Sequence, residues 1–188
     1  MRTGIDKPHY SISQLKCFSK CPYQYYLRYI ERMPQLPLYP LISGSALHAG
    51  LEEDNILLIK GKPQAKPEFI IDRAVAEYDK RLEDSKEEPQ FDVGEHSDIL
   101  VAEITAPTHE YFKTLRVDLM SQEIEAAEKE FWTEIGGQPF VGYTDVTTKH
   151  LVYDYKLLKR KKSATQVNFD PQLVVYEQVE KKPGAFIQ

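Results

Sequence analysis

The stretch Gln122–Leu158, QEIEAAEKEFWTEIGGQPFVGYTDVTTKHLVYDYKLL, decides the fold that we predict for this chain. Residues 122–135 alternate polar and apolar side chains, as a half-buried strand does. The pair Gly136-Gly137 is typical of a tight hairpin turn. Two more strands are expected at 140–148 and 151–158. The pattern therefore predicts three consecutive antiparallel strands.

Helical patterns lie on both sides of this stretch. Before it, apolar residues recur at helical spacing in the segments 11–19, 22–30, 44–59, 68–84 and 98–115. We expect the last of these to be interrupted near Pro107, and Met33–Pro40, with three prolines, to be an extended connection. After it, a helix is expected from about Asp170 with Pro171 in its first turn. The order is helices, a β-meander and a final helix.

Size and composition indicate one soluble domain over residues 1–188. The chain is 41% hydrophobic and 28% charged, and no stretch approaches the roughly 20 apolar residues that a membrane span needs. Met1–Tyr10 lacks the apolar core of a secretory signal. The two cysteines, Cys17 and Cys21, are expected to be reduced thiols in a cytoplasm.

The net charge of −5 argues weakly against a nucleic-acid partner, but its distribution favours one. Basic residues follow one another at Lys156 and at 159–162, and a smaller basic group contains Lys16, Lys20, Arg28 and Arg32. Judged by charge alone, a solvated loop at 159–162 is the alternative interpretation.

The candidate chemistry lies at the second and third strands. Asp154 and Lys156 are two residues apart, so their side chains share one face of a strand. The hairpin can bring Asp145 level with Asp154, and two carboxylates held close together favour a divalent cation such as Mg²⁺ or Mn²⁺. The alternative is that both aspartates are surface residues paired with Lys149 or Lys156.

Five blocks of the sequence, taken in order, resemble a known family. They are the Ser-x-Leu step and Cys-Pro aromatic helix of Ser11–Ile30, the glycine and histidine of Gly44–Glu52, the Gly-Tyr-Thr-Asp of Gly142–Asp145, the Asp-Tyr-Lys of Asp154–Lys156 and the Gln-x-x-x-Tyr of Gln172–Tyr176. The chain resembles the RecB-like exonuclease branch of the PD-(D/E)XK nuclease superfamily. It is similar in this respect to CRISPR-associated adaptation nucleases and to the nuclease domains of helicase-nucleases. Residues 60–120 match no diagnostic block.

The resemblance implies a fold and a metal site. The expected fold is α/β, a restriction-endonuclease-like core with a central mixed sheet flanked by helices. Asp145 and Asp154 would bind Mg²⁺ or Mn²⁺, the backbone carbonyl of Tyr155 would complete the coordination, and His48 would be a further ligand. Lys156 would orient the attacking water or neutralise charge on the scissile phosphate.

The resemblance also implies DNA contacts. Gln172 and Tyr176 lie one turn apart on a helix and would reach the substrate together. Basic residues of the run at 159–162 would contact phosphates: Lys159, Arg160, Lys161 and Lys162. Without the resemblance, His48 is a lone helical histidine and Tyr176 a core residue. Glu52, one turn after His48, is either a solvated glutamate or a support for the histidine or a second metal.

The sequence departs from the family pattern in two ways. Iron-sulfur members pair a cysteine at the Cys21 position with three cysteines near the C-terminus, and this chain has none after Cys21. We therefore expect no iron-sulfur cluster. Only twelve residues follow Tyr176, so we expect the chain to be truncated relative to longer family members.

The function expected from these residues is a metal-dependent DNA nuclease. Exonuclease activity in recombination, repair, phage DNA metabolism or CRISPR adaptation is the first hypothesis, in the cytoplasm of a prokaryote or as a phage product. DNA is the expected partner, with a helicase or a recombination or adaptation protein as a second one. The alternative is a catalytically inactive nucleic-acid-binding or assembly module on the same fold.

Overall fold

The computed structural model describes residues 9–33, 39–63, 65–84, 93–158 and 160–187, with the backbone alone described over 93–96. Four strands form one sheet in the order β1-β2-β3-β4. Their bounds are β1 Ile124–Ile135, β2 Gln138–Thr148, β3 Val152–Tyr155 and β4 Gly184–Ile187. Neighbouring strands are antiparallel from β1 to β3, and β4 runs parallel to β3. The sheet is therefore mixed, as the predicted fold requires.

The β1–β2 hairpin follows from its turn. Gly136 and Gly137 both have positive φ, +59° and +74°, a conformation that glycine adopts without steric conflict. Ile135 and Gln138 pair directly across them. The predicted hairpin is confirmed, and its two-residue turn sets the register as far as Ala126 and Thr147, beyond which an irregularity shifts the pairing by one residue at Ile124.

The third strand is shorter than expected, and a fourth strand was not foreseen. β3 ends at Tyr155 rather than at Leu158. The next N–H, that of Lys156, donates to the carbonyl of Ile187 at 2.7 Å, after which the chain leaves the sheet. β4 has four residues in a parallel pair, and so short a segment carries no readable alternation.

Nine helical segments are described. They are α1 Ile12–Lys20, α2 Pro22–Tyr25, the π-helix η1 Tyr26–Ile30, α3 Tyr39–Ile59, α4 Pro67–Asp84, α5 Val93–Lys113, α6 Leu115–Ser121, α7 Ala164–Asn168 and α8 Pro171–Glu180. The Ser11 hydroxyl caps α1 by accepting from the N–H of Gln14.

Two helix boundaries differ from the prediction. α3 begins at Tyr39, so Tyr39 and Pro40 belong to a helix and not to an extended link, since a proline is tolerated in a first turn. The rest of that link, residues 34–38, lies outside the described residues. α5 continues through Pro107, so the expected interruption there is wrong. The helix instead ends at Lys113, and α6 begins two residues later.

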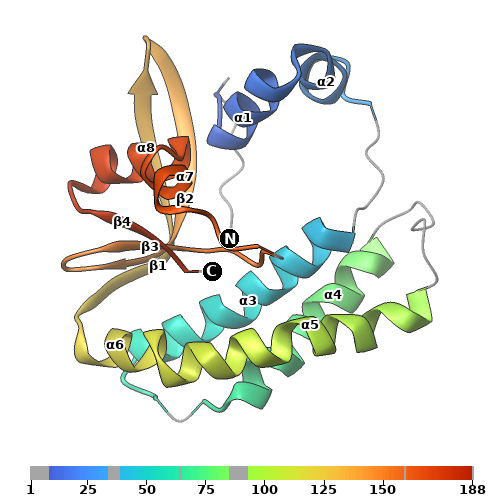
Figure 1. The fold of residues 1–188 in the computed structure, drawn as a ribbon, viewed down its shortest axis with the longest axis vertical. Helices are drawn as coiled ribbons and strands as arrows, with labels where there is room; N and C mark the ends of the chain where they lie inside the picture. Colours follow the sequence, from blue (N-terminus) through green and yellow to red (C-terminus); the bar gives the residue numbers. More distant parts are fainter. Residues whose placement is uncertain (1–8, 34–38, 64, 85–92, 159, 188) are drawn as a thin grey trace.

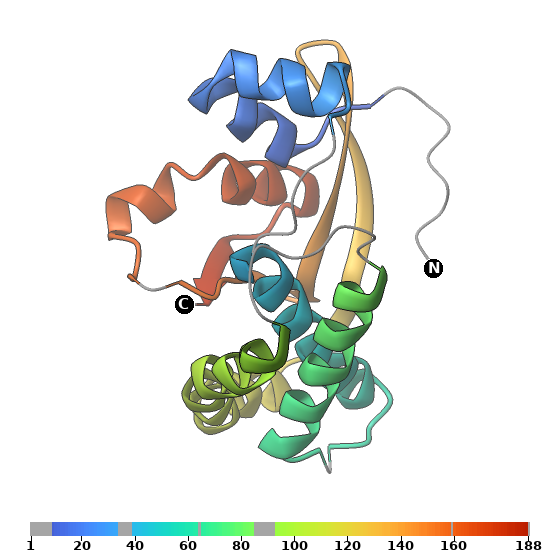
Figure 2. The ribbon, with the colours of Figure 1, turned by 90° about the vertical axis from the view of Figure 1, so that its right-hand side faces the viewer.

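Helices cover the sheet on two sides, as Figures 1 and 2 show. The helices α3 to α6 gather at one end of the molecule, and α1, α2, α7 and α8 lie at the other. Alternation along β3 sends Tyr153 and Tyr155 into the buried cluster shared with α3–α6, and Val152 into the cluster shared with α1 and α8. This arrangement confirms an α/β core with a central mixed sheet flanked by helices.

Within the described ranges, none of the helices has the length and apolar character that crossing a bilayer would require.

Candidate active site

Two buried aspartates lie side by side at the centre of the sheet. Val146 of β2 faces Tyr153 of β3, so Asp145 and Asp154, each one residue further along, are neighbours in the ladder. The N–H of Tyr155 donates to Asp145 Oδ2 at 2.6 Å. The structure therefore brings together the two carboxylates that the sequence analysis selected.

Asp154 is nearly inaccessible, with 1% of its surface exposed. Its Oδ1 accepts from the amide of Gln172 at 2.7 Å. Its Oδ2 lies 2.5 Å from the ammonium of Lys156 but is buried without a geometrically aligned hydrogen bond. Burial, and then the charge of Asp145, raise the pKa of Asp154 to about 6. The single charge of the Lys156 ammonium offsets these two costs only in part, and a divalent cation bound to Asp154 would offset them further.

His48 on α3 faces two acceptors. Its Nδ1 lies 3.2 Å from Asp145 Oδ1, and its Nε2 lies 2.9 Å from the backbone oxygen of Tyr155. Burial alone would lower the pKa of His48, but the hydrogen bond and the charge of Asp145 raise it. Because neither partner can donate, the arrangement suits a doubly protonated ring. A cation bound to either nitrogen takes the place of one proton.

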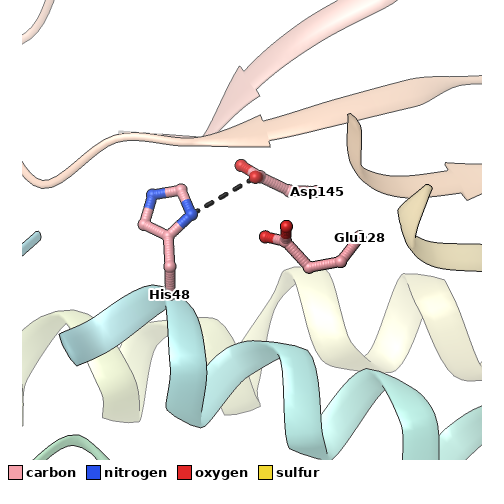
Figure 3. Close-up of side chains that lie close together, drawn as sticks. All are labelled: His48, Glu128 and Asp145. Carbon is pink, nitrogen blue, oxygen red and sulfur yellow. Dashed lines mark ion pairs between the residues drawn. The ribbon is translucent and has the colours of Figure 1, made fainter. Parts of the chain in front are cut away.

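Glu128 on β1 completes the group and was missed from the sequence. One ligand atom each of His48, Glu128 and Asp145 lie within 4.8 Å of one another, and Figure 3 shows the three side chains converging between α3 and the sheet. Glu128 has φ +48° in the middle of a strand, a conformation that non-glycine residues adopt at an energetic cost and that clusters at functional sites.

Counting from the hairpin turn could have found this residue. Glu128 lies eight residues before Gly136, and Asp145 lies eight residues after Gly137. A two-residue turn places such positions opposite each other, as the flanking pairs Ala127 with Val146 and Lys129 with Thr144 show.

The family model of the PD-(D/E)XK nuclease superfamily matches residues 9–183. The chain belongs to this superfamily. A search of curated proteins finds no matching relative. PD-(D/E)XK membership implies a nuclease that hydrolyses phosphodiester bonds with the help of a divalent metal ion. The RecB-like branch stays a prediction.

The residues present fit the metal ion of a PD-(D/E)XK nuclease. Carboxylate oxygens and an imidazole are ligands for Mg²⁺ and Mn²⁺, and the group of His48, Glu128 and Asp145 offers both kinds. The buried Oδ2 of Asp154, which lies beside the Lys156 ammonium without an aligned hydrogen bond, is a further oxygen ligand next to that group. The carbonyl of Tyr155, already turned toward His48, is available beside them.

The glutamine and tyrosine of the α8 motif are hydrogen-bonded to the strands of the candidate site, Gln172 to Asp154 of β3 and Tyr176 to Tyr143 of β2. The Gln172 amide donates to Tyr176 Oη at 2.8 Å, besides its bond to Asp154. The Tyr176 hydroxyl donates to the carbonyl of Tyr143 at 2.5 Å and is buried. The two residues share a helix face as expected, and a DNA contact of either one stays a prediction.

Gly142 allows Tyr176 and β1 to approach closely. A Cβ added at Gly142 would lie 2.4 Å from the ring of Phe131, its cross-strand partner. Phe131 in turn packs edge-on against Tyr176, with ring centroids 5.6 Å apart. A larger residue at position 142 would displace this ring stack.

The basic run divides into exposed and engaged residues. Lys159 lies outside the described residues. Arg160 and Lys161 are exposed, whereas the ammonium of Lys162 donates to Asp170 at 2.6 Å and lies 4.3 Å from the centroid of the Phe186 ring. Arg160 and Lys161 are therefore the described members of the run that are best placed to meet a substrate.

A groove of about 1130 Å³ opens over the candidate metal ligands His48, Glu128 and Asp145. Its lining includes Ser13 of α1, Glu52 of α3, Glu130 of β1 and Lys156. Glu52 therefore faces the same groove as His48, and its role as support or second ligand remains a prediction. The groove is open to solvent, which suits a polymeric substrate better than an enclosed pocket would.

A buried polar network supports Tyr155 from behind. The Tyr155 hydroxyl accepts from the Asn55 amide at 3.0 Å, and Tyr111 donates to Asp54 at 2.9 Å and to Asn55 at 3.2 Å. Arg116 binds both oxygens of Asp54, at 2.8 and 3.0 Å. Tyr155 therefore links this network to the candidate metal ligands through its own backbone.

Proposed function

We propose that this chain is a Mg²⁺- or Mn²⁺-dependent deoxyribonuclease that degrades DNA from an end. The observation that supports it best is the buried pair of Asp145 and Asp154 beside Lys156, with one Asp154 oxygen lacking an aligned hydrogen bond. Raised pKa values of buried carboxylates cluster at functional sites, and burial beside Asp145 raises the pKa of Asp154 to about 6. Work in recombination, repair, phage DNA metabolism or CRISPR adaptation, in a prokaryotic or phage setting, belongs to the same proposal.

Each residue has a role that follows from its position. His48, Glu128, Asp145 and Asp154, with the carbonyl of Tyr155, would hold the cation. When bound, the cation supplies a water of lowered pKa and stabilises charge on the leaving oxygen. Lys156 is a quarter exposed and lies beside Asp154, so its ammonium can reach a scissile phosphate or orient the attacking water. Gln172 keeps Asp154 Oδ1 in place.

A cleavage assay on labelled linear and circular DNA tests the proposal. Purified protein should shorten linear DNA from its ends in Mn²⁺ or Mg²⁺, leave closed circles intact and do neither in a chelator. Cleavage of circles at the same rate would contradict end-dependence. DNA binding without cleavage in either metal would instead support the inactive binding module.

His48→Ala should weaken metal binding on the order of 10- to 100-fold, because it removes one ligand and leaves the carboxylates. Activity should fall at low Mn²⁺ and recover in part as Mn²⁺ is raised. Calorimetric titration of Mn²⁺ measures the change. His150→Ala is the control, because His150 is exposed in the β2–β3 turn. Equal Mn²⁺ affinity of His48→Ala and the parent would remove His48 from the site.

Reversing the exposed charges of Arg160 and Lys161 should weaken DNA binding and flatten its salt dependence. Loss of two phosphate contacts lowers the slope of log K against log salt by about 1 to 2. Fluorescence anisotropy in the presence of a chelator measures binding without cleavage. The control is the double variant Lys66→Glu with Lys113→Glu, two exposed lysines away from the groove with the same change in net charge. Equal salt slopes in both double variants would show that Arg160 and Lys161 do not contact DNA, as expected for a solvated loop.

A further inference from the structure

Helix α1 packs against the body of the protein next to the candidate active site. Its Ile12 is buried in the cluster that contains Phe131 and Tyr176, and Ser13 lines the groove. The helix also extends one cationic side chain, Lys16, toward the start of α8. The blocks that carry the family resemblance assign no role to this lysine.

Lys16 makes two bonds across this contact. Its ammonium donates to Asp170 Oδ1 at 2.7 Å and to Gln172 Oε1 at 3.3 Å. Asp170 is the N-cap of α8 and accepts from the N–H of Gln172 at 2.9 Å. Lys16, which is 156 positions from Gln172 in sequence, therefore binds both the N-cap of α8 and the residue two positions after it.

Lys16, Asp154 and Tyr176 together fix which way the Gln172 amide points, and Lys16 is the donor on its oxygen side. An ammonium can only donate, and an ionised carboxylate can only accept. The Gln172 amide lies between an ammonium and a carboxylate. Its Oε1 points toward Lys16, and its Nε2 donates to Asp154 Oδ1 at 2.7 Å. The reverse orientation would set an amide oxygen against a buried carboxylate and an NH₂ group against an ammonium, so both contacts would become repulsive.

We propose that Lys16 is a positioning residue for the metal site, acting through Gln172 on Asp154. By holding the amide, Lys16 keeps a donor on Asp154 Oδ1, so that Oδ2, paired with the Lys156 ammonium at 2.5 Å, is the oxygen through which Asp154 would bind a metal ion. Groups that orient metal ligands in this way typically change affinity 10- to 100-fold when removed. The proposal rests on the proposed metal site and makes α1 part of it.

Two matched variants separate positioning from a structural role. Lys16→Met and Lys162→Met each remove one ammonium from Asp170 and change the net charge equally, but the bond to Gln172 Oε1 is made by Lys16. Calorimetric Mn²⁺ titration of the full chain without DNA should show about tenfold weaker binding for Lys16→Met. It should show less than a twofold change for Lys162→Met, and Lys16→Arg should restore most of the parent affinity.

A coupling measurement completes the test. In a Gln172→Leu background, Lys16→Met should lower Mn²⁺ affinity little further, because the amide through which it acts is gone. In ¹⁵N spectra of the metal-free protein, the Gln172 side-chain NH₂ signals should shift in Lys16→Met and stay in place in Lys162→Met. These signals report the environment of the amide directly, even in a variant that is less stable.

The outcomes distinguish this inference from the proposed function. Equal losses of affinity in both lysine variants, additive effects with Gln172→Leu, or a parent chain that binds no Mn²⁺ would each overturn the positioning role. A chain that shows the predicted coupling in Mn²⁺ binding but cuts no DNA would keep the role of Lys16 and refute the nuclease.

Discussion

Asp145→Asn and Asp154→Asn are each expected to lower metal-dependent cleavage by about 10³-fold or more while the protein stays folded. A catalytic metal contributes several kcal/mol to transition-state stabilisation, and each 1.4 kcal/mol is tenfold in rate. Asparagine keeps the size of the side chain and removes the charge that holds the cation. Cleavage of labelled DNA in saturating Mn²⁺ measures the loss, and cleavage by either variant at the parent rate would refute the metal assignment.

Without a bound metal, in a chelator, the pH dependence of folding stability should differ between Asp154→Asn and the parent. The pKa of Asp154 is raised to about 6, by burial first and then by the charge of Asp145. The folded protein thus holds this proton more tightly than the unfolded chain, so stability should fall as pH rises from about 4 to about 6. In Asp154→Asn that fall should shrink. Urea unfolding across this pH range measures it, with Asp79→Asn, an exposed carboxylate, as the control.

Arg116→Met is expected to destabilise the protein by about 3–5 kcal/mol, the usual result of removing one partner from a buried ion pair. Asp54 is fully buried, and Arg116 binds both of its oxygens. The variant leaves that carboxylate with Tyr111 as its remaining donor among the bonds described. Urea unfolding in a chelator gives the free-energy change directly.

A matched variant checks that burial is the reason. Arg81 forms a surface pair with Glu77 one helical turn away, so Arg81→Met should change stability by less than about 0.5 kcal/mol. Adding Asp54→Asn to Arg116→Met should recover part of the loss, because the unpaired charge is then gone. A loss for Arg116→Met as small as that for Arg81→Met would contradict the prediction.

Features of this fold that follow from local rules could be predicted from the sequence, and features that depend on distant contacts could not. The glycine pair at 136–137 fixes a hairpin, and residue spacing then places Asp154 and Lys156 on one face. The four-residue strand β4 pairs in parallel with β3 across a long connection, and nothing in its own residues shows that. Pro107 does not interrupt α5, which buries Leu100 and Ile104 before it and Tyr111 after it in the core.

Within the candidate site, too, residues in local motifs could be predicted from the sequence, and residues that contact the site from distant segments could not. Asp145, Asp154 and His48 were selected from their motifs and do lie together. Glu128 was overlooked because it sits among other acidic residues of β1, although its distance from the turn marks it. The contact of Lys16 with Gln172 joins the first helix to the last long one, and no pattern of spacing in a single sequence reports such a pair.

Tyr155 connects the candidate metal site to the buried polar network, so substitutions in that network should affect metal binding. Its N–H donates to Asp145 and its carbonyl faces His48, two candidate metal ligands, while its phenol belongs to the polar network of Asn55 and Tyr111. A random-mutagenesis screen for an altered metal requirement should therefore recover changes at positions 54, 55, 111 and 116 as well as at the ligands themselves. In related sequences, substitutions at these four interior positions should covary. Even a conservative exchange at one of them should be accompanied by a compensating exchange at another.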